Sequence, residues 1–396
     1  MRRALALALL VSCSSTPKTP ATVSNGNVNV KTFADERAFL EKNGKVIVLE
    51  GDRGAKIALS AEYQGRVMTS AVSDTGRSLG WINHDFIEKK KTGTQFDNFG
   101  GEDRFWLGPE GGQYGLYFPP GAKFDFDLWQ TPHAMQEGAW NVTAQDAKSV
   151  TFQKTMKVTN WSGTSFDVDV TRTIRVIPTQ GEVPGVAYES ENVITNAGKD
   201  PWTKEKGLLS IWILAMYAPV PDTRVVVPFD TKGQGTIVND AYFGKVPSDR
   251  LVVKEEKGVL FFKCDGKHRS KIGLPPTRAR GALGSYSAEA KLLTIVTYDP
   301  APPGSPYVNS MWEQQKDPYG GDVVNSYNDG SPGPGKPPLG GFYEIETSSP
   351  GVALAPGAKA KHTHRTQHYV GEPAQLDPIA KQAFGVSLAE ISGSLP

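Results

Sequence analysis

The sequence predicts an all-β protein folded as one large antiparallel sandwich. The 396 residues include 42 Gly and 29 Pro, and 10% of them are aromatic, which favours many short strands and turns over a helical bundle. Period-two runs recur from about residue 45 to residue 370 without a clear linker, and they do not alternate with helices. Roughly fifteen to twenty strands are therefore expected. A roll of several small sandwich domains is the alternative.

Individual elements can be placed in order along the chain. A helix is expected over 32–43, because Phe33, Arg37 and Leu40 recur at helical spacing and Gly44 can end it. Segment 328–341 is rich in Gly and Pro and is expected to be a long surface loop inside the domain. Residues 376–391 predict two short helices that are broken at Gly385 and cover a sheet edge or face. The clearest strands are expected at 46–49, 56–59, 150–152, 166–170, 173–176 and 292–296.

The amino terminus has the pattern of a targeting segment. A basic start is followed by an apolar run over 4–11, which is far shorter than the roughly 20 residues of a membrane-spanning helix. The run Leu10-Val11-Ser12-Cys13 resembles a bacterial lipoprotein signal, in which the cysteine is lipidated, and Ser14 rather than Asp implies the outer membrane. We therefore expect a signal peptide with its lipid-bearing Cys13 over 1–13, a flexible tether over 14–30 and a single domain over 31–396. The alternative is an ordinary secretion signal with an incidental cysteine.

Charge and motif content exclude several classes of function. Lys and Arg total 43 against 42 Asp and Glu, so a general nucleic-acid surface is not expected, and a membrane would be met only through the lipid anchor. The serine-hydrolase elbow, the phosphate loop, the dinucleotide fingerprint and H-E-x-x-H do not occur in the sequence. With Cys13 acylated, Cys264 has no disulfide partner and is expected to be a buried structural thiol.

The most informative polar pattern spans residues 342–369. Glu344 and Glu346 share one strand face, and His362, His364 and His368 share a face of the next predicted strand. The two sets would converge if these strands lie in one sheet. They would then serve as general acids and bases, or a divalent metal would be held by His362, His364 and Glu344, although the sequence requires no cofactor. The alternative is a solvated polar sheet face.

A second pattern lies between residues 96 and 118. Glu102, Arg104 and Trp106 alternate, and an acid, a guanidinium and an indole that project together suit a sugar or carboxylate site. The alternative is a structural ion pair with Trp106 in the core. Further candidates for substrate binding are Trp129, His368, Asn325 and Asn328, although Asn328-Asp329-Gly330 also has the composition of a plain turn.

Four segments together resemble a family of uncharacterised bacterial lipoproteins that is related in architecture to the galactose mutarotase-like supersandwich. They are 98–112 (NFGGEDRFWLGPEGG), 325–330 (NSYNDG), 343–346 (YEIE) and 362–365 (HTHR). The resemblance implies stacked, curved antiparallel sheets with a sugar-sized site on a concave face. Aldose epimerases use a histidine to protonate the ring oxygen and a glutamate to deprotonate the anomeric hydroxyl. Their Asn-His-x-Tyr-Phe-Asn-Leu and Asn-x-Leu-His-Gly-Gly motifs do not occur here, so their catalytic residues cannot be carried over.

Two functions fit these patterns. The first is a carbohydrate-active envelope enzyme, an epimerase, lyase or hydrolase, with His362 or His364 as the acid. The base would be Glu344, Glu346 or Glu102, while Arg104 would hold an oxyanion or sugar acid and Trp106 or Trp129 would stack on the ring. The second is a non-catalytic glycan-binding or structural lipoprotein, which would bind sugar without changing it.

Overall fold

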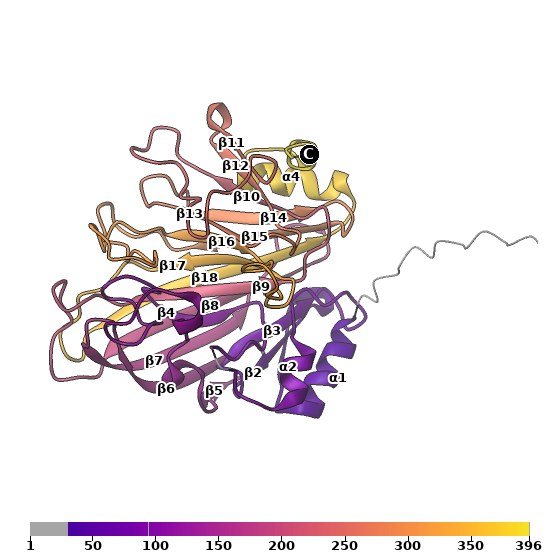
Figure 1. Ribbon diagram of the computed structural model, residues 1–396. Coiled ribbons are helices and arrows are strands. Elements are labelled where there is room, and N and C mark those ends of the chain that lie inside the picture. The colour runs from indigo at the N-terminus through magenta and orange to yellow at the C-terminus, as the bar shows by residue number, and fades with distance from the viewer. Residues whose placement is uncertain (1–30, 94, 396) are drawn as a thin grey trace, which may run out of the picture. The chain divides into compact units, whose positions relative to one another are not determined.

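The computed structural model describes residues 31–93 and 95–395. The signal peptide, Cys13 and the tether expected over 14–30 lie outside the described residues and stay predictions. Within these ranges the chain forms eighteen strands and a few short helices, which confirms the all-β fold (Figure 1). The residues 31–395 belong to one compact unit. No helix in the described part of the chain is both long and apolar enough to cross a membrane.

The helices are α1 (Phe33–Asn43), α2 (His84–Lys89), α3 (His133–Gln136), α4 (Pro373–Phe384) and α5 (Leu388–Ser392), with 3-10 turns η1 (Asp52–Gly54), η2 (Phe126–Leu128) and η3 (Glu255–Lys257). The strands are β1 (Ile47–Glu50), β2 (Lys56–Ser60), β3 (Arg66–Ala71), β4 (Arg104–Gly108), β5 (Asn141–Gln145), β6 (Ser149–Thr159), β7 (Ser165–Val176), β8 (Gly185–Asn196), β9 (Ser210–Tyr217), β10 (Arg224–Pro228), β11 (Leu251–Lys254), β12 (Val259–Lys263), β13 (Ser270–Leu274), β14 (Ala282–Ser287), β15 (Leu292–Tyr298), β16 (Val324–Asn328), β17 (Tyr343–Ser348) and β18 (Lys359–Val370).

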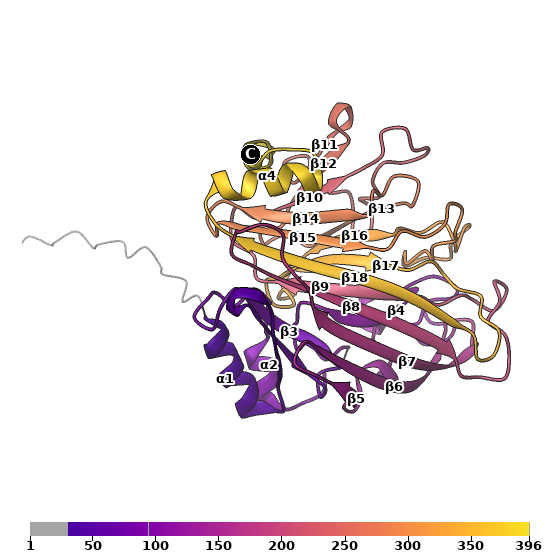
Figure 2. The ribbon, with the colours of Figure 1, turned by 180° about the vertical axis from the view of Figure 1, so that it is seen from behind.

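The strands form three antiparallel sheets. The largest has ten strands in the order β11-β12-β10-β14-β15-β18-β8-β7-β6-β5, and it is seen from its outer side in Figure 2. A five-stranded sheet has the order β13-β16-β17-β9-β4, and a small sheet has the order β1-β2-β3. The bridge Val67↔Asp103 joins β3 to the start of β4, so the small sheet continues the five-stranded layer. The runs 166–170 and 173–176, expected as separate strands, belong to the single strand β7.

The core lies between the five-stranded and ten-stranded sheets. Ala215 and Ile345 of the smaller sheet pack against Val225 and Leu283 of the larger one. A second cluster joins Phe105 to the long strands β6, β7 and β8. Each strand alternates in and out, so one face of the five-stranded sheet is buried in this core while its other face is free to carry polar groups.

The terminal helices pack on sheet faces, and for the C-terminal pair this was expected from the sequence. In α1 the Thr32 side chain caps the amino end through Asp35, and Phe33 and Leu40 pack against Met68 of β3. At the other end α4 stops at Gly385, whose φ of 76° is left-handed and easily adopted by glycine. The pair α4 and α5 packs Leu376 and Ile391 against β10, β12, β14 and β15. The two helices cover a face of the ten-stranded sheet.

The segment predicted as a surface loop runs from the end of β16 to the start of β17 without a helix or strand. Its base is fixed by the buried carboxylate of Asp329, which accepts hydrogen bonds from the backbone N–H groups of Gly340 and Gly341 at 2.8 Å each. Tyr327 also donates its hydroxyl to Asp329 at 3.0 Å. The Asn-Asp-Gly pattern therefore closes a long loop rather than a tight turn.

Candidate functional site

Polar and aromatic side chains collect on the outer face of the five-stranded sheet. The register pairs Arg104 with Leu214 and Leu214 with Glu346, so these residues lie in one row across β4, β9 and β17. A neighbouring row pairs Lys271 with Tyr327 and Tyr327 with Glu344. Because side chains alternate along a strand, both rows face away from the core that holds the intervening residues.

A pocket of about 590 Å³ opens over this face. Its floor is the sheet, and its walls are aromatic side chains from separate loops. The lining residues are Gln95, Phe96, Arg104, Trp106, Glu110, Phe126, Trp129, Trp212, Leu214, Phe243, Arg269, Lys271, Trp312, Tyr327, Leu339, Phe342 and Glu344. Four indoles and several charged groups in one cavity make it a candidate binding site.

Two buried ion pairs form the polar part of the floor. Arg104 donates from Nη2 to Oε1 of Glu344 at 2.8 Å, and its guanidinium lies 4.0 Å from the ring centroid of Trp106. Lys271 donates from Nζ to Oε2 of Glu346 at 2.9 Å, and Trp212 donates its indole N–H to the same oxygen at 2.9 Å. All of these groups are buried. Charges held this way are positioned before any ligand arrives.

Two carboxyl groups of the pocket bind a proton more readily than usual. Burial raises the pKa of Glu344 to about 7, against the pull of the Arg104 charge and with a smaller push from Glu346. Burial also raises the pKa of Glu110, although it accepts the indole N–H of Trp129 at 2.8 Å. For Lys271, burial lowers the pKa, but the carboxylates around it, Glu346 foremost, leave it raised overall. The pocket thus pairs a stable cation with two carboxyl groups whose pKa values are raised by burial.

Several buried polar atoms on this face have no hydrogen-bond partner among the described residues. They are Nε of Arg104, Nε1 of Trp106 and Oε1 of Glu346. Arg104 and Trp106, which carry the two unpaired donors, both line the pocket. A ligand with acceptor oxygens would satisfy them.

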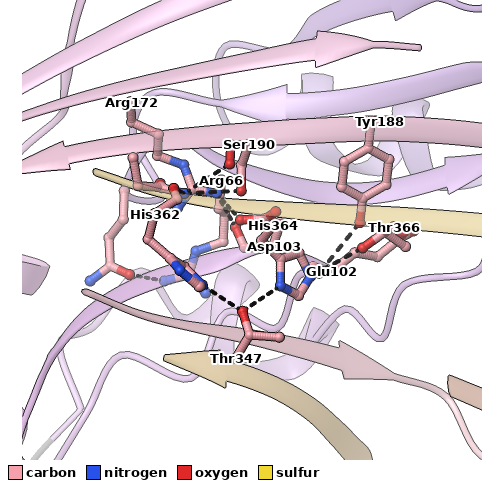
Figure 3. Close-up of polar contacts among 12 residues, drawn as sticks. Arg66, Glu102, Asp103, Arg172, Tyr188, Ser190, Thr347, His362, His364 and Thr366 are labelled. Carbon is pink, nitrogen blue, oxygen red and sulfur yellow. Dashed lines mark hydrogen bonds and ion pairs between the residues drawn. The ribbon is translucent and has the colours of Figure 1, made fainter. Parts of the chain in front are cut away.

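The histidines lie behind the sheet, not in the pocket. Strands β17 and β18 belong to different sheets, so the expected convergence of glutamates and histidines does not occur. Thr347 follows Glu346 on β17 and points the opposite way, into the core. Its hydroxyl contacts Nε2 of His362 at 2.8 Å and Nδ1 of His364 at 2.9 Å (Figure 3). The three histidines do share one face of β18, as predicted, but that face is buried between the sheets.

Glu102 also points into the core rather than beside Arg104. Gly100 and Gly101 have positive φ angles and turn the chain before β4 begins at Arg104. As a result Glu102 contacts His368 at 3.1 Å and accepts a hydrogen bond from the hydroxyl of Tyr188 at 3.1 Å. The expected trio of acid, guanidinium and indole is therefore reduced to Arg104 and Trp106.

These buried groups form what we call the inter-sheet polar cluster. His368 also contacts the hydroxyl of Thr294 at 2.8 Å. Asp103 forms a fully buried ion pair with Arg172. The members of the cluster are Glu102, Asp103, Arg172, Tyr188, Thr294, Thr347, His362, His364 and His368. They connect the segment just before β4 with β7, β8, β15, β17 and β18, so they join the two sheets by polar contacts.

The metal set suggested by the sequence does not come together. Glu344 opens onto the pocket, while His362 and His364 contact Thr347 on the other side of the same sheet. Across the residues that the structure describes, no group of three or more His, Cys, Asp or Glu side chains is placed to hold a metal ion.

The two asparagines have separate places. Asn325 lies beside the pocket, where its amide contacts the hydroxyl of Tyr242 at 3.1 Å. Asn328 is buried and holds the loop between β12 and β13: it accepts from the N–H of Gly266 at 2.8 Å and donates to the carbonyl of His268 at 2.9 Å. Cys264, at the start of this loop, is buried, and burial raises the pKa of its thiol, as expected of a structural cysteine.

Sequence patterns missed much of the pocket. Arg104, Trp106, Trp129 and Glu344 were expected there and line it. Lys271 was missed, although it stands next to the apolar Ile272 in a run that resembles a strand. Its strand lies at the edge of the five-stranded sheet, where lysines are common, so the residue type carried no signal of a site. The loop residues carry no periodic signal that could have identified them; they are Glu110, Phe126, Phe243, Arg269 and Trp312.

The buried histidines predict an acid-sensitive fold. Burial lowers the pKa of His362 to about 3 and that of His364 to about 4, from a usual 6.5. Between pH 6.5 and these values the unfolded chain binds protons that the native chain does not. This contribution to the free energy of unfolding is therefore fully present above pH 6.5. Below pH 6.5 it falls by up to about 1.4 kcal/mol per pH unit for each histidine.

We expect the double variant His362→Gln/His364→Gln to lose this part of the pH dependence of the free energy of unfolding. Urea unfolding series between pH 7.5 and 4.5 measure it. His133→Gln serves as a control because the side chain of His133 is 73% exposed. An unchanged slope in the double variant would show that these histidines are not held neutral by burial.

Comparisons with known proteins place the chain by family and by fold. A putative aldose 1-epimerase from Escherichia coli K12 superposes with a TM-score of 0.51 at 11% identity, covering 83% of this chain and 99% of that one. A putative aldose 1-epimerase from Klebsiella pneumoniae superposes with a TM-score of 0.49 at 11% identity, covering 89% of this chain and 84% of that one. A galactose mutarotase-like protein from Lactobacillus casei superposes with a TM-score of 0.46 at 12% identity, covering 82% of this chain and 100% of that one.

The likeness to the Escherichia coli protein confirms the expected galactose mutarotase-like fold. No curated protein matches the sequence. Residues 31–395, nearly the whole described chain, match a single family. The chain belongs to the family described as a family of unknown function, DUF6786.

Proposed function

We propose that the pocket binds a carbohydrate and that its carboxyl groups perform acid–base chemistry on the bound sugar. The observation that carries this proposal is the combination of Trp106, Trp129, Trp212 and Trp312 around the buried Arg104–Glu344 pair. A pyranose has apolar C–H faces that pack on indoles and polar edges that bond to charged groups.

Glu344 and Glu110 are the proposed acid and base. Both line the pocket, and burial raises the pKa of each, so one can hold a proton while the other is ionised. The protonated carboxyl would donate to a ring or glycosidic oxygen, and the carboxylate would accept a proton from a sugar hydroxyl. In an epimerase the two roles then reverse, and no net proton is consumed. This assignment moves the acid from the buried histidines to one of these two carboxyl groups.

The remaining charged groups position rather than react. Arg104 holds Glu344 by a 2.8 Å hydrogen bond and orients its carboxyl toward the pocket. Glu346 is fully buried beneath Lys271 and Trp212, and it fixes both side chains by hydrogen bonds. Lys271 would then meet a sugar oxygen. The Escherichia coli neighbour is described as a putative aldose 1-epimerase, which agrees with such chemistry but concerns that protein.

A non-catalytic glycan-binding role is the second candidate. Two observations favour it: Glu344 and Glu346 are each already paired with a cation, and none of the described residues that line the pocket is a histidine. Sugar would then bind by stacking and hydrogen bonding and leave unchanged. The two candidates share the pocket and differ in whether the sugar is altered.

Proton NMR of the purified full-length protein with galactose, glucose and their uronic acids tests both candidates. Saturation transfer reports binding, and exchange between anomers reports turnover. We expect both signals for wild type. Glu344→Gln and Glu110→Gln should lower the exchange rate at least about 100-fold, since a positioned acid or base contributes 10²–10⁴-fold, and should keep saturation transfer.

Glu289→Gln is the matched control, because Glu289 is exposed in the turn between β14 and β15. Saturation transfer without exchange in wild type would contradict the catalytic role and support the glycan-binding one. The absence of both saturation transfer and anomeric exchange with every sugar would contradict the carbohydrate pocket itself.

We also propose that the protein is anchored to the bacterial cell envelope, at the outer membrane, by a lipid on Cys13. The support is the order of basic residues, apolar run and Leu10-Val11-Ser12-Cys13 in the sequence. Bacteria expressing the full chain should incorporate labelled palmitate into it, and Cys13→Ala should abolish the label while Cys264→Ala keeps it. Equal labelling of wild type and Cys13→Ala would contradict the anchor.

A further inference from the structure

The pocket contains one cation that the ion pairs of its floor do not use. Arg104 is paired with Glu344, and Lys271 is paired with Glu346. Among the described residues that line the pocket, Arg269 is the cation with no carboxylate within ion-pair distance. Its Nε is buried, and no described residue accepts a hydrogen bond from it. A guanidinium stays charged at any physiological pH, so this charge is not removed by deprotonation.

Aromatic stacking orients this guanidinium. The central carbon of Arg269 lies 3.6 Å from the ring centroid of Phe243, with the rings of Phe126 and Trp312 at 5.4 Å and 6.0 Å. Stacking covers the faces of the planar group and leaves its N–H edge free. That edge matches the two oxygens of a carboxylate, or of a phosphate ester, in paired hydrogen bonds.

The loop that carries Arg269 is fixed by buried contacts. Asn328 bonds both Gly266 and His268 in the same loop, at 2.8 Å and 2.9 Å. Gly330 packs against the backbone of Arg269 so closely that a Cβ there would meet the backbone nitrogen at 2.2 Å. The guanidinium is therefore preorganised by the sequence Asn328-Asp329-Gly330 rather than placed by a flexible surface chain.

The position of Arg269 in the pocket defines which part of a ligand it meets. Arg104 and Lys271 are buried in the floor at 2% and 5% exposure, whereas Arg269 is half-buried on a loop at the rim. The sugar ring would lie over the floor, and the group at Arg269 would project toward the mouth. The only other unpaired charge on the lining is Glu110 (within the residues described), whose raised pKa lessens its competition for Arg269.

We infer that the ligand of this pocket is an anionic sugar whose carboxylate or phosphate ester is held by Arg269. The inference rests on the proposed carbohydrate pocket and specifies the class of sugar that it takes. It also moves the anion-binding role expected of Arg104 to a residue that the sequence did not single out.

Binding titrations of the full-length protein test this inference. The probes are galactose, galacturonate and galactose 6-phosphate, with affinities measured by saturation-transfer NMR or calorimetry. We expect at least one of the two anions to bind about tenfold or more tightly than galactose, and the preferred one identifies a carboxylate or a phosphate ester. The preference should shrink with added salt.

Arg269→Gln should remove the preference while changing galactose affinity less than about threefold, and Arg269→Lys should restore part of it. Arg280→Gln is the control, because Arg280 is an exposed arginine on the loop between β13 and β14, and it should bind like wild type. Thermal unfolding checks that each variant is folded.

Three outcomes would overturn the inference. Equal affinity of wild type for galactose and both anions would leave the carbohydrate pocket standing and refute its anionic ligand. An equal loss of galactose and anion affinity in Arg269→Gln would show that Arg269 only supports the aromatic wall. Failure of every sugar to bind would instead refute the proposed function together with the inference built on it.

Discussion

The two-residue period of β17 divides this molecule into two chemical environments. Glu344 lines the pocket and Glu346 lies on the same outer face beneath Lys271, while Ile345 and Thr347 face the ten-stranded sheet. A strand in the middle of a sheet cannot turn a residue to the other face without a bulge, and the register of β17 with both neighbours is unbroken. The separation of pocket carboxylates from core histidines follows directly from this alternation. It also explains why four consecutive residues can serve both the core and the outer face of the sheet.

The inter-sheet polar cluster is costly to bury, and its value lies in specificity. Removing one partner of the buried Asp103–Arg172 pair would leave an isolated charge, which typically costs 3–5 kcal/mol. Glu102, by contrast, is well supplied with partners, since Ser70, Tyr188 and His368 all contact it. Such contacts can form only when the sheets meet in one relative position. The polar cluster thereby ties the five-stranded sheet that carries the pocket to the ten-stranded sheet.

The sequence was sufficient for the fold because the fold rests on local periodicity. Alternation, turn residues and the break at Gly385 identified the all-β class, the terminal helices and the long loop before β17. It also placed His362, His364 and His368 on a shared face. It could not say which sheet each strand joins, so the glutamates and histidines were expected together. Arg269 and Phe243 could not be predicted for a different reason: they meet through loops whose side chains follow no period.

The central claim is that ligand binds on the outer face of the five-stranded sheet and not at the histidines. The indole N–H resonances of a ¹⁵N-tryptophan-labelled protein, assigned by single substitutions, test it in one titration with galacturonate. We expect shifts for Trp106, Trp129, Trp212 and Trp312, which line the pocket, and none for Trp140, Trp161 and Trp202, which do not. Shifts confined to the second group, with the four pocket indoles unmoved at saturation, would contradict it.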